Sequence, residues 1–277
     1  MPYMFKSKSS VIVGLTTFHC EYLDLSIPAL SRVAKRFTLV IHNDNPDVVV
    51  TPHQVRALGY RGPLHIINSD KNVGMLQSRL AILDFIRATR IRGDWVVFSD
   101  DDDFLLNTDV PTVSPNNFAV IQNMVVLRSR LVDVLRVMRN PLNYTVDDSA
   151  VCLIKPHVGL AGTLIRIDAA FRMADVLRES LDAIHSIDSG LSFRPPVDIM
   201  MWSALNIIAR HDNPAASPIY MDCVNYIASD LDTSVTKYGM QVYPSRDAAK
   251  QISHAVSQYD GVIRSALNSP SAKDTDE

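Results

Sequence analysis

Four consecutive aspartates, Asp100 to Asp103, are the residues of this 277-residue chain most evidently suited to chemistry. They follow the apolar run Trp95 to Phe98, which predicts a buried strand that ends at Ser99. Adjacent carboxylates in a turn repel one another, and a divalent cation removes that conflict. Mg²⁺ and Mn²⁺ take oxygen ligands and commonly bind through one or two carboxylates together with substrate phosphates. The turn therefore indicates a metal–diphosphate site, and a solvated acidic turn is the alternative.

Spacing argues against several other sites. An EF-hand loop beginning at Asp100 needs Asp or Asn at its fifth position, Gly at its sixth and Glu at its twelfth, where the chain has Phe104, Leu105 and Pro111. The chain has no G-x-x-x-x-G-K-[ST] phosphate loop, and Gly14 in the first expected strand does not begin a G-x-G-x-x-G motif. ATPases, GTPases and ordinary NAD-dependent dehydrogenases therefore lose their main support.

Composition narrows the class of partner. With 27 basic and 30 acidic residues the formal net charge is -3, so no global positive field is present and we expect no nucleic-acid partner. Three cysteines far apart in sequence predict reduced thiols in a cytosolic protein. No apolar run reaches the ~18 residues of a membrane span. We expect a cytoplasmic chain without a transmembrane segment, with peripheral association at the inner membrane face left open.

The first hundred residues alternate between short β-branched runs and longer amphipathic stretches, a pattern that predicts helices crossing over a parallel sheet. The expected strands are Val11 to Leu15, Phe37 to His42, Leu64 to Ile67 and Trp95 to Phe98. The expected helices are Ser26 to Lys35, Thr51 to Leu58 and Gly74 to Arg90. The carboxyl edge of such a sheet is where ligands bind.

Beyond Asp103 the alternation is less regular. Phe118 to Val126 fits either a strand or a helix. The other expected elements are strands at Val151 to Ile154 and Thr163 to Ile167, and helices at Leu127 to Arg139, Ala169 to Ile184 and Asp198 to Arg210. No repeat or linker separates two units, so we predict one domain over residues 1–267, with a nucleotide-binding half (1–104), an acceptor half (105–267) and a disordered tail (268–277).

Four motifs follow one another in the predicted nucleotide-binding half, each at a strand end or a helix start. They are Thr16 to Glu21, then Asn43-Asp44-Asn45, then Asn72, Gly74 and Arg79 in the pattern N-x-G-x-x-x-x-R, and finally Asp100-Asp101-Asp102 in the pattern D-x-D. In this order they resemble the motifs of GT-A glycosyltransferases, most closely the large inverting group called family 2.

The resemblance implies an α/β GT-A fold, with a Rossmann-like nucleotide-binding half on a mostly parallel sheet and a mixed acceptor-binding half. It implies that Asp102 ligates Mn²⁺ or Mg²⁺, with His211 as a further metal ligand. The residues it assigns to the nucleotide-sugar are Thr16, Thr17, Glu21, Asp44, Asn72, Arg79, Asp100 and Asp101. The structural alternatives are a turn cap for Thr16, an Asx-turn for Asp44, a solvated helix position for Arg79 and a surface or capping role for His211.

The segment Pro195 to Trp202 resembles the place where family 2 enzymes carry an acceptor-side carboxylate. Asp198 is then the catalytic base, in a helix first turn where the dipole favours its ionised form; an ordinary N-terminal acid is the alternative. Trp202, one helical turn later, either stacks on an acceptor sugar or packs in the core. Gly162 either lets the backbone approach the acceptor or serves a close-packed strand.

The leading hypothesis is a metal-dependent glycosyltransferase that moves a single sugar from a UDP- or GDP-linked donor to the hydroxyl of a carbohydrate or lipid-linked acceptor, with inversion, as in polysaccharide biosynthesis. One alternative is a sugar-nucleotide pyrophosphorylase, which usually carries a glycine-rich, basic loop where this chain has Thr16 to Glu21. Another is a non-catalytic nucleotide- or carbohydrate-binding protein of the same fold.

Overall fold

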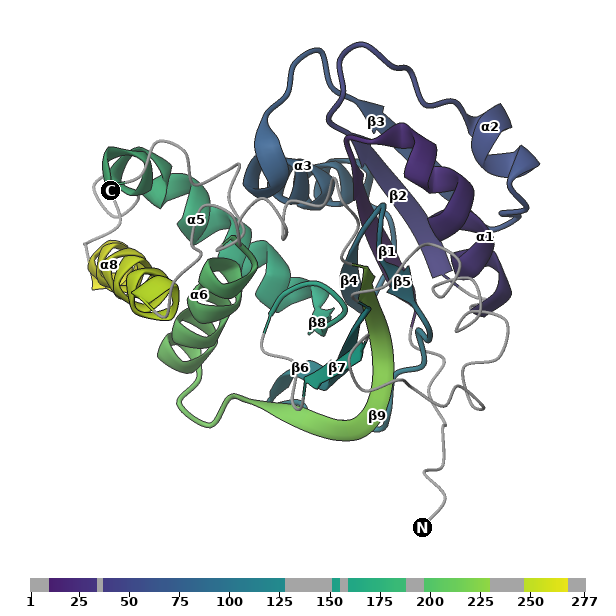
Figure 1. Cartoon of the computed structure of the whole chain (residues 1–277). Helices are drawn as coiled ribbons and strands as arrows, with labels where there is room; N and C mark the ends of the chain where they lie inside the picture. Colours follow the sequence, from purple (N-terminus) through teal and green to yellow (C-terminus); the bar gives the residue numbers. More distant parts are fainter. Residues whose placement is uncertain are drawn as a thin grey trace.

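A single nine-stranded sheet runs through the part of the chain that the computed structural model describes, namely residues 10–33, 37–127, 151–154, 159–187, 197–229 and 247–268 (Figure 1). Its strands are β1 (Val11–Thr17), β2 (Phe37–Asn43), β3 (Leu64–Asn68), β4 (Trp95–Asp100), β5 (Phe104–Leu105), β6 (Asn117–Leu127), β7 (Val151–Ile154), β8 (Leu164–Arg166) and β9 (Ser217–Ser229). Their order is β3-β2-β1-β4-β8-β6-β9-β5, and β7 pairs with β6.

The strands β3, β2, β1 and β4 form a parallel half whose carboxyl ends lie at one edge. Val11 to Leu15 and Trp95 to Phe98 are buried on both faces, as expected of parallel strands covered by helices on each side. Helices α1 (Leu23–Val33) and α2 (Pro52–Ala57) cover one face, and α3 (Gly74–Thr89) covers the other (Figure 1).

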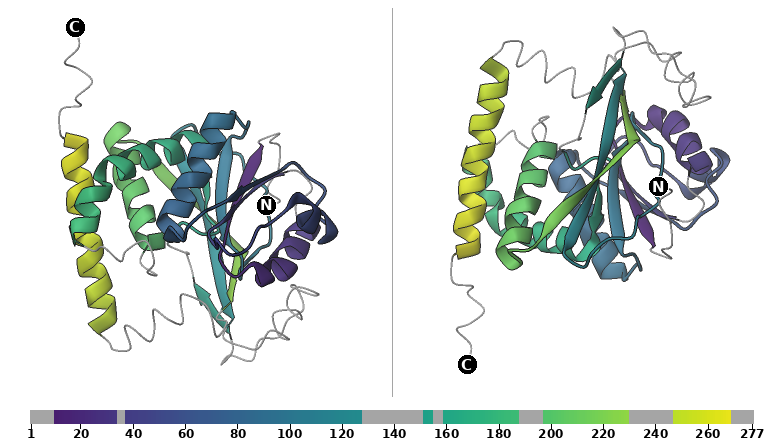
Figure 2. Two further views of the ribbon diagram at one scale, coloured as in Figure 1. Left: turned by 90° about the horizontal axis from the view of Figure 1, so that it is seen from above. Right: turned by 90° about the horizontal axis from the view of Figure 1, so that it is seen from below.

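The second half of the sheet is mixed. Strand β8 pairs antiparallel with both β4 and β6, β6 pairs parallel with β9, and β5 pairs antiparallel with β9. Helices α5 (Ile167–Ile187), α6 (Val197–Asp212) and α8 (Asp247–Asn268) pack together on the side of the sheet that carries α3. Figure 2 shows α8 as the outermost of these helices.

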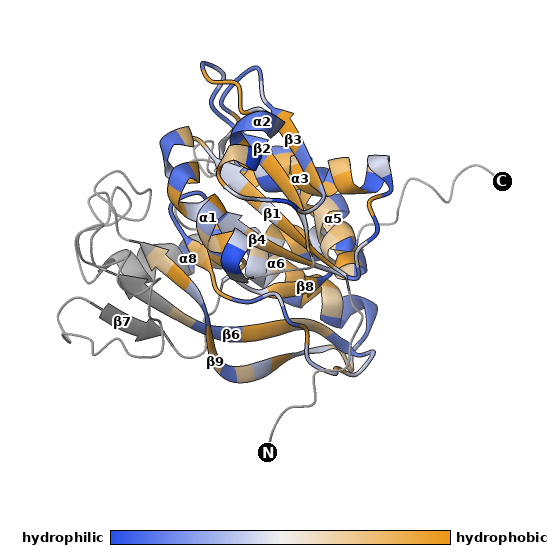
Figure 3. Ribbon diagram, turned by 90° about the vertical axis from the view of Figure 1, so that its right-hand side faces the viewer, coloured by the Kyte–Doolittle hydropathy of each residue, from blue (hydrophilic) through white to orange (hydrophobic). Residues whose placement is uncertain are grey.

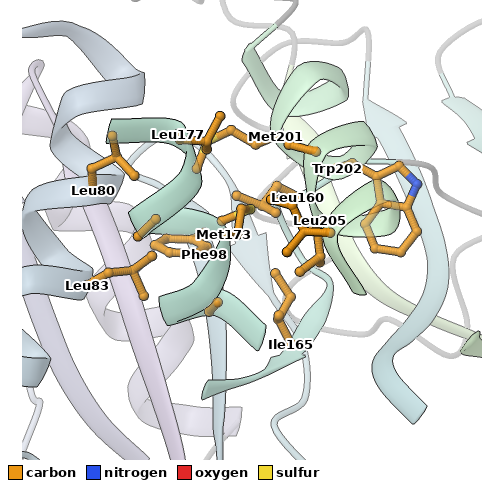
Figure 4. Packing of buried hydrophobic residues seen from close by; sticks show 14 of the residues in the cluster. Leu80, Leu83, Phe98, Leu160, Ile165, Met173, Leu177, Met201, Trp202 and Leu205 are labelled. Atoms are coloured by element: carbon orange, nitrogen blue, oxygen red, sulfur yellow. The ribbon is translucent and has the colours of Figure 1, made fainter. Parts of the chain in front are cut away.

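Two apolar layers fill the space between the sheet and its helices. Hydrophobic residues concentrate along the central strands, and the outer turns of the helices are hydrophilic (Figure 3). The larger layer joins α3, α5 and α6 to the sheet through side chains such as Leu80, Phe98, Met173 and Leu205 (Figure 4). Trp202 is 7% exposed and lies 6.2 Å from the Phe118 ring between centroids, so it packs in the core, the second of its two expected roles.

The expected α/β architecture, with a mostly parallel nucleotide-binding half and a mixed second half, is confirmed. The expected elements within the described residues are present, with ends shifted by a few residues, and the ambiguous segment from Phe118 forms β6. The expected helix at Leu127 to Arg139 lies outside the described residues apart from Leu127, which ends β6. Strands β5 and β9 and helix α8 are additions to the sequence prediction.

Two further expectations concern the C-terminal tail and membrane-spanning segments. Asn268, expected to begin a disordered tail, instead ends α8, and residues 269–277 lie outside the described part. Among the described residues, no helix is both long enough and apolar enough to cross a membrane.

Candidate functional site

The candidate site lies where β1 and β4 end side by side at the carboxyl edge of the sheet. The strand order reverses between these two strands, since the chain continues from β1 outward to β2 and β3 before it returns to β4. Ligands of open α/β sheets bind in the crevice at such a point. Thr16 is opposite Asp100 in the strand register, and its hydroxyl donates a hydrogen bond to Asp100 Oδ1 at 2.6 Å.

The four aspartates alternate in their surroundings. Asp101 and Asp103 are 7% and 9% exposed, whereas Asp100 and Asp102 are only partly buried. Asp101 Oδ2 accepts hydrogen bonds from the Thr17 hydroxyl and from the Phe18 amide. The buried pair thus holds the turn to the protein, and the other pair is the more accessible.

The turn accumulates negative charge in a poorly hydrated place. Burial raises the pKa of Asp101 to about 7, against the opposing effect of the Thr17 hydrogen bond. Burial, followed by the charges of Asp103, Asp101 and Asp100, raises the pKa of Asp102 well above its usual value. Such a carboxylate cluster favours an added cation over an added anion.

Arg79, in helix α3, is the cation already present beside the turn. Its side chain is fully buried and donates to Asp198 Oδ1 through Nη1 and to both oxygens of Asp100, at 3.2 and 3.3 Å, through Nη2. Burial acts to lower the pKa of Arg79, but Asp198 and Asp100 outweigh it and raise that pKa. The expected alternative of a solvated helix position is therefore wrong for Arg79, because its guanidinium joins two carboxylates inside the protein.

Asp198 lies in the first turn of α6, and its ion pair with Arg79 connects it to the acidic turn. Its Oδ1 atom accepts from Arg79 and from the Ala161 amide at 3.3 Å, and its side chain is 26% exposed. No described residue donates a hydrogen bond to its Oδ2 atom. One oxygen is therefore anchored, and the other is left for a ligand.

Asp44 and Asn72 position helix α3. The Asp44 carboxylate accepts from the backbone amides of Val73 and Gly74, at 2.7 and 2.8 Å, and Asn72 Oδ1 accepts from the Gly74 amide at 3.1 Å. These amides lie at the start of α3, where a helix leaves N–H groups unpaired. Both side chains are thus used to fix the helix that carries Arg79, which is a structural role for two residues expected to contact the nucleotide.

Gly162 lies close to the turn, and its environment explains why it is glycine. Its φ angle is +73°, and a Cβ there would lie 2.6 Å from the Tyr226 ring. Its amide donates to the Phe98 carbonyl at 2.8 Å. The backbone at residue 162 is therefore pressed between β4 and β9, a form of the close packing given as one of its two expected roles.

Two expected site residues are not brought to the turn. Glu21 is in a short 3₁₀ helix (Cys20–Tyr22), is 69% exposed in its side chain, and makes an ion pair with His19 at 3.7 Å. His211 is in the last turn of α6, about 20 Å from Asp198 along the helix at 1.5 Å per residue. It lines an open pocket of about 440 Å³ between α6 and α8, together with Arg210 and Arg264.

His211 is therefore corrected from a metal ligand to a surface residue that is hydrogen-bonded to Asp212, because α6 carries Asp198 and His211 at opposite ends. Within the described ranges, no group of three or more His, Cys, Asp or Glu side chains is arranged to hold a metal ion by itself. A cation held through one or two carboxylates and the phosphates of a ligand needs no such group.

Tyr226 and Ala161 contact the candidate site, and the sequence analysis does not single them out. Tyr226 donates its phenolic hydrogen to Asp103 Oδ2 at 2.6 Å. It belongs to β9, a strand that the sequence pattern does not predict, because polar residues such as Asp222 and Asn225 interrupt its apolar alternation. The only sequence signal is Gly162, whose missing side chain makes room for the Tyr226 ring.

Comparison with known proteins gives structural likenesses at low identity. No family model and no curated protein matches the sequence. The chain is similar to TarS (residues 1–349) from S. aureus, with 13% identity, a TM-score of 0.47 and coverage of 93% of this chain and 82% of that one. It is similar to the mannosyltransferase PcManGT from Pyrobaculum calidifontis, solved with GDP-Man and Mn²⁺, with 11% identity, a TM-score of 0.46 and coverage of 96% and 77%. It is also similar to the glycosyltransferase GlyE from Streptococcus pneumoniae TIGR4, with 13% identity, a TM-score of 0.37 and coverage of 88% and 52%.

Proposed function

We propose that the chain is a metal-dependent glycosyltransferase that moves one sugar from a UDP- or GDP-linked donor to the hydroxyl of a carbohydrate or lipid-linked acceptor, with inversion. The observation that carries the proposal is the buried guanidinium of Arg79, which joins the acidic turn to Asp198 from a distant helix. This contact supports a site in which the acidic turn takes the donor and Asp198 takes the acceptor, at the carboxyl ends of β1 and β4.

The residues present fit a hard divalent cation, Mn²⁺ or Mg²⁺. The turn supplies carboxylate oxygens, and the Arg79 guanidinium is already paired with Asp100 and Asp198, so it does not also pair with Asp102. Asp102 is the residue that we propose to hold the cation, with Asp100 beside it. When bound, the cation neutralises the charge that develops on the departing diphosphate.

Asp198 is proposed as the general base. Its Oδ1 atom is fixed by Arg79 and by the Ala161 amide, so its Oδ2 atom is presented in one orientation. In the proposed step, Oδ2 takes the proton of the acceptor hydroxyl while that oxygen attacks the anomeric carbon and the bond from this carbon to the diphosphate breaks. Attack on the face opposite the leaving group inverts the configuration. A positioned base contributes about 10²–10⁴-fold to such a rate.

The geometry around Thr17 disfavours the pyrophosphorylase alternative. The turn after β1 donates the Thr17 hydroxyl and the Phe18 amide to Asp101, so it closes on the acidic turn. Its only side chain able to carry positive charge is that of His19, which faces Glu21. A loop that cradles a triphosphate needs several outward amides or basic side chains instead.

The test of the proposed function is nucleotide binding by calorimetry, with UDP and GDP, in the presence and absence of Mn²⁺. Mn²⁺ should promote binding of one nucleotide, and Asp102→Ala should abolish that promotion. The matched control is Asp109→Ala, which removes an exposed carboxylate outside the turn. Absent nucleotide binding, or binding indifferent to Mn²⁺ and to Asp102, contradicts the proposal.

A further inference from the structure

Tyr226 ties together the two ends of the acidic turn. Its hydroxyl donates to Asp103 Oδ2 at 2.6 Å and accepts from the Asp100 amide at 3.3 Å. The Asp103 amide in turn donates to the Asp100 carbonyl at 3.2 Å, which closes the turn from within. A single phenolic oxygen from β9 therefore contacts the first and the last residue of the aspartate run.

The position of this hydroxyl is fixed by packing. Tyr226 is 2% exposed, and its backbone is paired with Leu105 of β5, just beyond the turn. Its ring lies against Gly162, where even a methyl group would meet ring atoms at 2.6 to 2.8 Å. The ring cannot shift toward this residue, and the hydroxyl is held at one place relative to the turn.

Asp103 is hydrogen-bonded to Tyr226, whereas Asp102 is the residue proposed to hold the cation. Asp103 is buried, and its Oδ2 atom accepts the hydrogen bond from the Tyr226 hydroxyl, so this bond fixes the end of the turn that follows Asp102. Hydrogen-bond partners that orient a metal-binding group, without touching the metal themselves, matter for affinity. Their removal typically lowers the affinity for the metal by about 10–100-fold.

We propose that Tyr226 is a positioning residue for the cation site: by holding Asp100 and Asp103, it fixes the part of the turn that carries Asp102. The inference rests on the proposed function, since it takes Asp102 as the residue that holds the cation. It also makes β9, a strand of the acceptor half, part of the support of the donor-side metal site.

Tyr226→Phe tests the inference, because it keeps the ring against Gly162 and removes only the hydroxyl. Mn²⁺ affinity, measured by electron paramagnetic resonance of free Mn²⁺ with UDP or GDP present, should fall by about 10–100-fold. Nucleotide affinity without metal should stay within twofold, an outcome that general loss of structure does not give. The matched control is Tyr220→Phe on the same strand, whose hydroxyl bonds Asn123 and Asp222, and which should bind Mn²⁺ normally.

Asp103→Asn is a second test of the positioning role, and it can be used if Tyr226→Phe does not fold. Because Tyr226 and Asp103 share the bond at Asp103 Oδ2, the double variant should lose less Mn²⁺ affinity than the product of the two single losses, whereas independent effects would multiply. Normal Mn²⁺ binding by Tyr226→Phe, or multiplied effects in the double variant, overturns the positioning role and leaves the proposed function standing. Failure of the unaltered chain to bind Mn²⁺ with either nucleotide overturns both.

Discussion

Arg79 Nη1 donates a hydrogen bond to Asp198 Oδ1, and the two residues are 119 positions apart in sequence. Arg79 comes from the helix that follows β3, and Asp198 from the first turn of α6. The same guanidinium contacts Asp100 at the end of β4. The guanidinium therefore fixes the distance between β4, in the parallel half of the sheet, and helix α6.

Replacing Arg79 should destabilise the fold strongly. Arg79→Gln leaves two partly buried carboxylates without their cation, and breaking a buried pair by removing one partner costs about 3 kcal/mol or more. Urea unfolding at 25 °C measures the loss. Arg87→Gln is the control, because the ion pair of Arg87 with Asp175 is exposed and should contribute less than about 1 kcal/mol. Equal free energies of unfolding for the two variants would contradict a structural role for the buried pair.

Replacing Asp198 should separate chemistry from nucleotide binding. Asp198→Asn keeps the size of the side chain but removes the proton acceptor, so transfer or hydrolysis of a donor should fall by about 10²–10⁴-fold. The Kd for the nucleotide with Mn²⁺ should change less than threefold, since the proposed donor contacts lie at the β1 and β4 ends. Unchanged turnover would rule out Asp198 as the base, and would favour another base or a non-catalytic binding protein.

Replacing each of three glycines by alanine should change the free energy of unfolding by a different amount. Gly162→Ala should lower the free energy of unfolding by about 2 kcal/mol or more, because its φ is positive and a Cβ would collide with Tyr226. Gly59→Ala has a positive φ of +102° but open space, so it should cost only about 1–2 kcal/mol. Gly261→Ala lies in α8 with nothing within 4 Å, and should stabilise by about 0.5–1 kcal/mol. Chemical denaturation of the three variants checks the ranking.

Stability at alkaline pH should depend on Tyr60. Burial raises the pKa of Tyr60 to about 12, although Arg56 opposes the shift, and the hydroxyl donates to the Phe37 carbonyl at 2.9 Å. The folded chain thus keeps this proton above pH 10, where the unfolded chain releases it. The contribution is complete below pH 10 and is lost as the pH rises toward 12.

The measurement is urea unfolding of the unaltered chain and of Tyr60→Phe at pH 8, 10 and 11. The stability difference between them should be constant up to about pH 9.5 and should then shrink as the pH rises. A difference that grows above pH 10 would show that Tyr60 ionises more readily in the folded chain than in the unfolded one.

The parallel half of the fold could be predicted because its strands are short, β-branched and buried on both faces. Val11 to Leu15 and Trp95 to Phe98 are apolar without interruption, so their strands follow from hydrophobicity alone. In contrast, β9 was missed because Asp222 and Asn225 lie within it, and its pairing with β6 contains register shifts. Helix α8 carries slightly more polar than apolar side chains, as a surface segment does, and only its tertiary contacts bury Tyr259 and Ile263.

The sequence identified residues of the candidate site, but it did not show which side chains they contact. The ordered motifs singled out Arg79 and Asp100, and the resemblance of the Pro195 to Trp202 segment singled out Asp198. The structure brings these three side chains together. Which of the four aspartates are accessible follows from hydrogen bonds to Thr17 and Tyr226, which are long-range contacts that no local pattern encodes. His211 was assigned to the metal site from the resemblance alone, although the helix predicted at Asp198 to Arg210 already places it at the opposite end of that helix from Asp198.

The long sequence separations in the site have a consequence for synthesis of the chain on the ribosome. Asp103 and Tyr226 are 123 positions apart, so the bond that closes the acidic turn cannot form until more than a hundred further residues have been added. At about 5–20 residues per second, that interval lasts several seconds. Throughout it, the strands β1 to β4 and the Thr17 and Phe18 donors to Asp101 are already synthesised, while the Tyr226 hydroxyl that donates to Asp103 has not yet been added.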